Sequence, residues 1–443
     1  MGAKQCSGYD RTDMLAGDKK HSVLSYFTGG SVHEDTAYFG WAALFMQLTL
    51  IGFYCLTDYE FGSETVFDGE TAMQVLLGTM VFAVAGMGLS GTWMRAFGIS
   101  AFGFGLVIMV FALQEAMLVE GWMRSGTLNL KLCELNFITG MRGVVCVLIS
   151  WGAMAGKISP VIMLFFSLCE VAVYYANKVY ILENTFNVID IGGAISIHVF
   201  GAFFGVCCCL GLSLIPYMQL HESSHQSDVM STVGTGLMWI YFPTFVASGA
   251  QMNTAAQRTA IMNTIFALLG STGAAFATGP LFNPQGLVLT TDMLRLSTLA
   301  GGVAISSIAH LQLGPGGALL VGTLGGMCSS WLCHLKLYDR RQLVEKLELA
   351  DSYGVMYLSG LPGVLSAVIS MALPLLVKNT GIVWMDQFLG LLTTISLACV
   401  SGFITGRLAK SSATLFPVPD LDFNDSTYWN AKDVPNHGLF GGN

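Results

Sequence analysis

Long hydrophobic stretches separated by short polar breaks run along almost the whole chain. A hydrocarbon layer about 30 Å thick requires roughly 20 apolar residues in a helix, and segments of this length recur from end to end. The predicted spans are 37–57, 71–93, 98–120, 135–155, 159–181, 190–215, 229–249, 259–280, 294–312, 314–335, 354–377 and 384–406. The pattern therefore predicts an all-α, polytopic membrane protein with about 12 transmembrane helices.

The composition excludes a water-soluble protein of this size. Of the 443 residues, 53% are hydrophobic and only 11% are charged, which leaves too little polar surface to face water. The polar start of the chain holds no short apolar run with a cleavage site, so the first span is expected to direct the chain to the membrane. We divide the chain into an N-terminal cytoplasmic segment (1–36), a transmembrane domain (37–408) and an acidic cytoplasmic tail (409–443).

The distribution of lysine and arginine gives the expected orientation. With the N-terminus in the cytoplasm, most of these residues fall on the cytoplasmic side, as the positive-inside rule requires. Both termini are then cytoplasmic, and the plasma membrane is the expected location. The Asp-rich part of the tail, 419–433, is either a solvated segment, the favoured interpretation, or a binding segment for a partner. Cys55 and Cys133 lie near the predicted outer face, where a disulfide is one option.

An internal repeat links the sixth and eleventh predicted spans. Asp190 is followed by a glycine and then by His198, and Asp351 is followed at the same spacings by a glycine and by Ser359. His198 and Ser359 each stand eight residues after their aspartate, and eight residues of helix cover about 12 Å. An aspartate near the end of a span would therefore place the histidine or serine near the middle of the bilayer. Many transporters build a midplane site from repeated halves in this way.

Among the residues of the repeat, His198 has the side chain with the widest range of possible chemistry. An imidazole is costly on a lipid-facing surface, so His198 should point into the bundle or a cavity. It is either a packed histidine that bonds a neighbouring helix or a pore-lining residue, and the residues alone leave both open. Asp190 and Asp351 could cap the starts of their helices, the favoured interpretation for Asp351.

Several motifs resemble the Rh branch of the ammonium-transporter superfamily. The segment from Ile189 to Gly205, IDIGGAISIHVFGAFFG, is similar to the signature in which an Asp, two small residues and an Ile-His precede Phe-Gly-Ala-x-Phe-Gly. Further motifs follow in family order from about Gly86 to Ser370: WMRAFGISAFGF, ALQEAMLVEGW, VLISWGAMAGKISP, LMWIYFPTF, TLAGGVA and YGVMYLSGLPG. The resemblance implies an ammonium-transporter-like inverted 5+5 helix repeat, a trimer, and a narrow hydrophobic pore in each protomer.

The resemblance also implies a pair of pore histidines, of which this chain retains one. Conducting relatives use two histidines to handle ammonia or ammonium. The first matches His198, within a signature that also includes Asp190, whereas the second matches Ser359. Serine does not titrate near neutral pH, so a paired-imidazole relay cannot operate, although the hydroxyl can still donate and accept a hydrogen bond.

The outer mouth of the implied pore departs from the family pattern. Relatives close it with two stacked phenylalanines, of which one matches Phe245 and the other falls on Arg142. An arginine within a span costs about 2.5–3.5 kcal/mol unless it finds water or an acid. A salt bridge is therefore expected, with these candidate partners: Glu134, Glu170, Glu115 and Asp190. With the alignment shifted by one turn, Arg142 would instead form a structural pair inside the bundle.

A second cation is expected in the outer vestibule. Lys178 follows Asn177 where relatives carry an acid. Two positive charges at the mouth would disfavour ammonium, because like charges repel, and would affect neutral ammonia or CO2 less.

These features imply a channel or transporter for ammonium, ammonia or a small neutral gas such as CO2, with a half-retained pore site. The alternative is a non-conducting scaffold or membrane subunit of a larger assembly, with its pore blocked by Arg142. A third interpretation is a sensor that signals through the tail. The expected partners are the lipid bilayer, the small solute, a homotrimer or a heterotrimer with a relative, and proteins that bind the tail. We find no pattern of an enzyme, a cofactor, a metal site or a nucleic-acid-binding surface.

Overall fold

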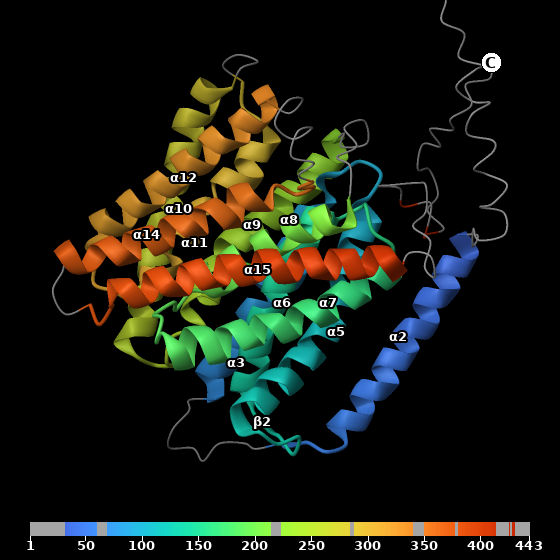
Figure 1. The fold of residues 1–443 in the computed structure, drawn as a ribbon. Coiled ribbons are helices and arrows are strands. Elements are labelled where there is room, and N and C mark those ends of the chain that lie inside the picture. Colours follow the sequence, from blue (N-terminus) through green and yellow to red (C-terminus); the bar gives the residue numbers. More distant parts are fainter. Residues whose placement is uncertain are drawn as a thin grey trace, which may run out of the picture.

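The computed structural model describes residues 32–59, 69–213, 223–283, 288–339, 350–376, 380–412, 425, 428 and 429. Helices make up nearly all of this part of the chain (Figure 1). Within it, ten helices are long and apolar enough to cross a membrane, and two shorter apolar helices cover Tyr38–Tyr54 and Met293–Ile308. Each of them overlaps one predicted span, so the predicted all-α, polytopic membrane fold is confirmed.

The α-helices have the following bounds: α2 (Val32–Tyr54), α3 (Gly69–Met80), α4 (Gly88–Ser90), α5 (Gly98–Ser125), α6 (Glu134–Met154), α7 (Pro160–Tyr175), α8 (Phe200–Leu212), α9 (His225–Ala247), α10 (Ala255–Phe282), α11 (Ala300–Ile305), α12 (Gly314–Asp339), α14 (Leu361–Leu376) and α15 (Trp384–Ser412).

Shorter elements connect them. The π-helical segments are η1 (Val81–Met87), η3 (Ala176–Thr185), η4 (Ala194–Val199), η5 (Met293–Ser297) and η7 (Met356–Gly360), and the 3-10 segments are η2 (Gly91–Trp93) and η6 (Ser306–Ile308). Two short parallel strands, β1 (Asp58–Tyr59) and β2 (Lys131–Leu132), pair with Asp58 opposite Lys131.

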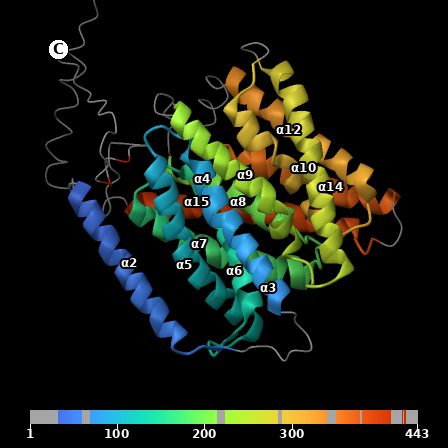
Figure 2. The same cartoon turned by 180° about the vertical axis from the view of Figure 1, so that it is seen from behind.

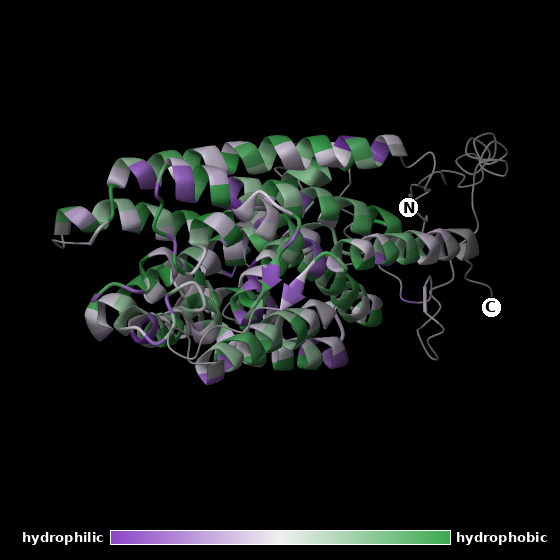
Figure 3. Cartoon of the chain, turned by 90° about the horizontal axis from the view of Figure 1, so that it is seen from below, coloured by the Kyte–Doolittle hydropathy of each residue, from purple (hydrophilic) through white to green (hydrophobic). Residues whose placement is uncertain are grey.

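Helix α6 forms the centre of the bundle. In its most apolar stretch 89% of the residues are buried, against 33% for α15, which runs along the outside (Figure 1). A helix that is apolar on all sides is expected to be enclosed by other helices, and α6 is such a helix. Helix α2 lies at the edge of the bundle in both Figure 1 and Figure 2. Hydrophobic residues dominate the helices (Figure 3).

The central helices approach each other closely at small residues. A Cβ atom on Gly205 of α8 would lie only 2.6 Å from the carbonyl oxygen of Ser150 on α6. Only glycine allows this backbone contact, which is the usual way for membrane helices to pack tightly.

Part of the acidic tail contacts the bundle. The Asp425 carboxylate accepts hydrogen bonds from the backbone N–H groups of Ile99 at 2.9 Å and Ser100 at 2.7 Å, in the first turn of α5. The indole of Trp429 donates to the hydroxyl of Ser100 at 3.0 Å. The expectation of a solvated tail is therefore wrong at these positions, because Asp425 caps a helix whose first N–H groups would otherwise lack acceptors.

Candidate functional site

The first repeated turn is built around Asp190. Its carboxylate accepts hydrogen bonds from the backbone N–H groups of Ile195 at 3.0 Å and Ser196 at 2.8 Å, and from the hydroxyl of Ser307 at 2.8 Å. Gly193 has a φ of 81°, a left-handed conformation that glycine adopts without steric cost. Asp190 therefore determines where η4 begins and ties it to η6.

The second repeated turn has the same form. The Asp351 carboxylate accepts hydrogen bonds from the N–H groups of Val355 at 2.9 Å and Met356 at 3.2 Å, and Gly354 has a φ of 73°. The interpretation of both aspartates as helix caps is confirmed. An aspartate, a left-handed glycine and a π-helical segment thus occur twice in the fold, and π-helical turns are frequent at functional sites.

The two turns bring His198 and Ser359 together. The imidazole Nδ1 of His198 lies 3.3 Å from the Ser359 hydroxyl oxygen, and each residue is only 2% exposed. The other ring nitrogen, Nε2, has no hydrogen-bond partner among the described residues. The ring lies parallel to that of Phe242 at 6.1 Å and edge-on to that of Phe245 at 6.1 Å. The repeat therefore pairs an imidazole with a hydroxyl at the centre of the bundle.

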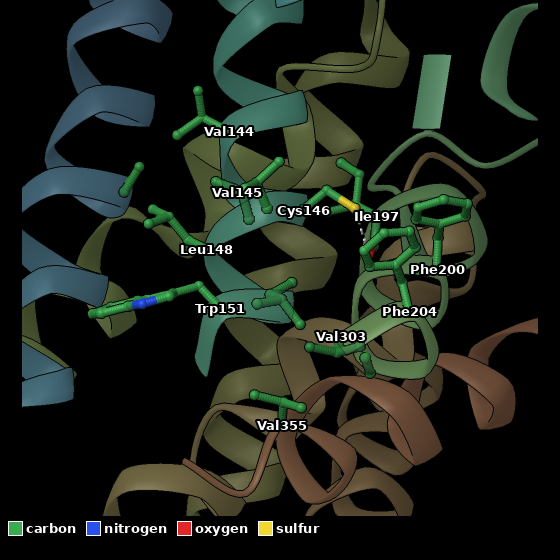
Figure 4. Close-up of a cluster of buried hydrophobic side chains, with 14 of the residues drawn as sticks. Val144, Val145, Cys146, Leu148, Trp151, Ile197, Phe200, Phe204, Val303 and Val355 are labelled. Atoms are coloured by element: carbon green, nitrogen blue, oxygen red, sulfur yellow. Dashed lines mark hydrogen bonds between the residues drawn. The ribbon is translucent and has the colours of Figure 1, made fainter. Parts of the chain in front are cut away.

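A mostly apolar cavity adjoins this pair. It leaves about 60 Å³ for the centres of water molecules, which is room for a few waters. Its lining residues include Phe82, Val145, Leu148, His198, Phe242, Arg295, Val303, Tyr353, Val355 and Ser359. Several of the apolar ones gather around α6 in Figure 4. The free nitrogen of His198 gives this cavity a hydrogen-bonding group for a small polar molecule.

Phe245 is stacked, but on a residue that sequence reasoning missed. The rings of Phe82 and Phe245 lie 4.7 Å apart with an angle of 8° between their planes. Phe82 belongs to η1, in a run of small apolar residues where a single aromatic side chain gives no hint of its role. Only the packing of η1 against α9 reveals the stack.

Arg142 lies close to Phe245 and is held by neutral oxygens. Its guanidinium donates to the Ser248 hydroxyl at 3.1 Å and to the Ile191 carbonyl at 2.8 Å, and its central carbon lies 5.8 Å from the centre of the Phe245 ring. The side chain is buried, with 5% exposure. A hydroxyl just after the end of α9 and a carbonyl of the Asp190 turn thus satisfy donors that would otherwise be costly to bury.

The expected salt bridge of Arg142 is wrong. Among the described residues no carboxylate lies within 4 Å of the guanidinium, and this includes all the candidates: Glu134, Glu170, Glu115 and Asp190. Asp190 accepts its bonds from η4 and η6 instead. Arg142 therefore carries a positive charge without a carboxylate partner in the described part of the chain.

Lys178 contributes no uncompensated charge. Its ammonium nitrogen lies 3.0 Å from a Glu120 carboxylate oxygen, which also pairs with Arg124 at 3.1 Å, and Arg124 pairs with Glu183 at 2.7 Å. The formal charges of this cluster cancel. The expectation of a second free cation at the mouth is therefore wrong, because a carboxylate from α5 reaches the lysine. Cys55 and Cys133 are both free thiols.

The chain matches the model of the Ammonium Transporter Family over residues 37–420. It belongs to the ammonium transporter family. Among curated proteins, ammonium transporter Rh type A of Bos taurus is 33% identical over 369 residues, covering 81% of this chain and 84% of that protein. Ammonium transporter Rh type B of Danio rerio is 31% identical, covering 79% and 80%. These relatives place this family member on the Rh-type branch.

Solved structures of the ammonium transporter family have the same fold. The Nitrosomonas europaea Rh50 structure aligns with a TM-score of 0.71 at 27% identity, covering 83% of this chain and 93% of that chain. A sensor Amt protein aligns with a TM-score of 0.62 at 16% identity, covering 78% and 93%, a likeness that concerns the fold alone. The ammonium-transporter-like architecture implied by the motifs is therefore confirmed, and the protein is an integral membrane protein.

Proposed function

We propose that this Rh-type protein passes an uncharged small solute, ammonia first and CO2 as the second neutral candidate, and excludes the ammonium ion. The observation that carries the proposal is the Arg142 guanidinium beside Phe245, with no carboxylate within 4 Å among the described residues. At an effective dielectric constant of about 20, two like charges about 6 Å apart repel by about 3 kcal/mol. Ammonium meets this barrier at the mouth, whereas ammonia does not.

The route we propose runs past Phe245 to His198 and Ser359 and on through the adjoining cavity. Ammonia both donates and accepts hydrogen bonds, so it suits a site with one free imidazole nitrogen and a hydroxyl. The hydroxyl of Ser359 orients the His198 ring but takes up no proton near neutral pH. The site therefore favours a neutral solute that crosses without a paired-imidazole relay.

We also propose that the protein works as a trimer, either of identical protomers or mixed with a relative, in the plasma membrane with both termini in the cytoplasm. The excess of lysine and arginine on one side of the spans supports the orientation. The trimer rests on the family resemblance. The acidic tail is proposed to bind partners through those of its residues that do not contact α5.

Flux measurements on purified protein in liposomes test the proposal. An ammonium gradient should raise the internal pH of protein-containing vesicles faster than that of empty vesicles, in a stopped-flow assay with an internal dye. Methylammonium uptake and ammonium-dependent current should stay at the level of empty vesicles. A current that follows the ammonium gradient would overturn the proposal, because a fixed cation at the mouth cannot admit such an ion freely.

The second candidate is a non-conducting membrane subunit. The observation that favours it is the stacked pair Phe82 and Phe245, 4.7 Å apart, with the Arg142 guanidinium fixed next to it by two hydrogen bonds. On this candidate, wild-type protein raises neither ammonia nor CO2 permeability. Replacing the three residues Phe82, Arg142 and Phe245 by alanine would then create a permeability that the wild type lacks.

A further inference from the structure

The cavity has two ends along α6, and they differ in what closes them. Arg142 and Gly152 stand about 15 Å apart along the helix axis, and Val145, which lies between them, lines the cavity. Phe245 lies beside Arg142, whereas Tyr353 lies against Gly152. Tyr353 is therefore at the end of the cavity that the stacked phenylalanines do not reach.

The Tyr353 ring is tightly enclosed. A Cβ atom on Gly91 would lie 3.0 Å from the Cε2 atom of this ring, and a Cβ on Gly152 would lie 3.2 Å from Cδ2. The ring of Trp151 meets it edge-on, with 5.8 Å between the centres. Glycines on η2 and α6 thus leave a slot that the phenol fills, and a larger residue at either position would force the ring to shift.

The hydroxyl of Tyr353 has no partner among the described residues. It is buried and makes no hydrogen bond to any described residue, although Tyr353 is a lining residue. Leaving a buried hydroxyl unbonded is costly, and native structures usually provide a partner or a water. A small polar molecule inside the cavity would supply the missing bond, as it would for the free nitrogen of His198.

Arg295 holds the backbone of Tyr353 in place. Its guanidinium donates to the Tyr353 carbonyl at 3.1 Å and to an Asp292 carboxylate oxygen at 2.6 Å. It also lies over the Trp93 ring, 4.6 Å from the centre. The contacts with Tyr353, Asp292 and Trp93 therefore compensate the charge of Arg295 and hold its side chain in place. Arg295 in turn holds the segment that carries the Tyr353 phenol.

We propose that Tyr353 is a second steric closure of the transport route, opposite the phenylalanine stack, and that Arg295 is its positioning residue. A neutral solute that leaves the cavity at this end must displace the ring and exchanges hydrogen bonds with the hydroxyl as it passes. The effect on transport rests on the proposed function, whereas the closure is a property of the fold and can be measured without transport.

Thiol labelling measures the closure directly. In a Ser359→Cys background, the cationic reagent methanethiosulfonate ethylammonium is applied to the solubilised protein, and the modified fraction at position 359 is followed by peptide mass spectrometry. The buried thiol of Cys209 serves as the internal reference. Tyr353→Ala should raise the rate at position 359 about tenfold, and Tyr353→Phe should change it less than about twofold, because the ring still fills the slot. Equal rates in all three proteins would overturn the proposal.

Arg295→Gln gives a second route to the same answer if Tyr353→Ala does not fold. This substitution leaves the Tyr353 ring intact but removes the guanidinium that donates to the Tyr353 carbonyl. The labelling rate at position 359 should therefore rise about threefold. Tyr180→Phe removes a hydroxyl that bonds the Met123 carbonyl at 3.5 Å, away from the cavity, and should leave the rate unchanged. A rise in the control but not in Arg295→Gln would contradict the assignment.

Liposome fluxes then separate the closure from the proposed function. Tyr353→Phe should lower ammonia permeability about two- to tenfold through the lost hydrogen bond, and Tyr353→Ala should raise it. If Tyr353→Ala raises the labelling rate but the protein conducts no ammonia, the closure by Tyr353 is supported and the proposed function is contradicted. If the protein conducts ammonia but substitutions of Tyr353 change neither the labelling rate nor the ammonia permeability, the proposed function is supported and the closure is contradicted.

Discussion

The turn at Asp190 and the turn at Asp351 have the same backbone form, yet only one is followed by an imidazole. Each has a capping aspartate and a left-handed glycine. His198 then follows the first turn, and Ser359 follows the second at the equivalent place. The backbone requires an acceptor and a glycine but not the side chain that comes next, so the shape of a repeated site can persist while its chemistry changes.

Each turn also binds an arginine, and the two arginines differ in their charge compensation. Arg142 donates to the carbonyl of Ile191 in the first turn, and Arg295 donates to the carbonyl of Tyr353 in the second. Asp292 pairs with Arg295 at 2.6 Å, whereas Arg142 has no carboxylate within 4 Å among the described residues. The two ends of the proposed route thus share their backbone form but differ in whether a carboxylate compensates the arginine.

The largest expected effect tests the shared backbone form. Asp190→Ala removes the acceptor of two backbone N–H groups and of the Ser307 hydroxyl, which should lower the free energy of unfolding by about 3–5 kcal/mol. Asp190→Asn, which keeps one carbonyl oxygen, should cost less. Size-exclusion profiles of heated samples in detergent give the Tm, and Asp351→Ala should also lower it markedly. A change of less than about 2 °C for Asp190→Ala would mean that the cap does not hold the turn.

The second effect tests the electrostatic difference. Arg142→Gln should raise the ratio of methylammonium to ammonia permeability about 10- to 100-fold, because the repulsion of about 3 kcal/mol is removed. Arg295→Gln should change this ratio less than about threefold, since that charge is already offset by Asp292. Arg258→Gln, at an exposed position, is the control. If the Arg142 and Arg295 variants had the same ratio of methylammonium to ammonia permeability, the proposed electrostatic difference between the two ends would be contradicted.

The third effect concerns the difference in side-chain chemistry. Ser359→Ala leaves His198 Nδ1 without its partner at 3.3 Å, and the loss of about 1 kcal/mol should lower ammonia permeability about fivefold. Ser359→Thr keeps a hydroxyl and should retain most of the flux. Ser359→His makes the two turns alike, and ammonia permeability should then vary between about pH 5 and 8. A pH-independent flux in this variant would show that a second imidazole adds nothing.

The smallest effect concerns Lys178. Lys178→Met breaks its contact with Glu120, which keeps Arg124 as a partner, so the free energy of unfolding should fall by about 1 kcal/mol, the net value of one hydrogen bond. The loss should change little in high salt, because the two side chains are only 12% and 5% exposed and salt screens buried pairs weakly. The ratio of methylammonium to ammonia permeability should not change. A rise in that ratio would restore Lys178 to the role of a free cation at the mouth.

The sequence predicted well what depends on periodicity and spacing. The spans follow from apolar length, and the pairing of His198 with Ser359 follows from the repeat and the family motifs. It predicted poorly the contacts between distant elements. The partners of Arg142 are a hydroxyl and a carbonyl far along the chain, and Phe82 reaches Phe245 from another helix. Any oxygen or ring brought close by packing can satisfy such a side chain, and spacing along one helix does not reveal which.

The cap that Asp425 places on α5 also determines the order of events during synthesis. Its acceptor for the Ser100 N–H group comes 325 residues later in the chain. At about 5–20 residues per second, a ribosome needs roughly 15–65 s to cover that distance. Throughout this interval the first N–H groups of α5 lack the hydrogen bonds that Asp425 later accepts from them. Completion of that end is therefore a late, post-insertion step that only a chain translated past Asp425 can perform.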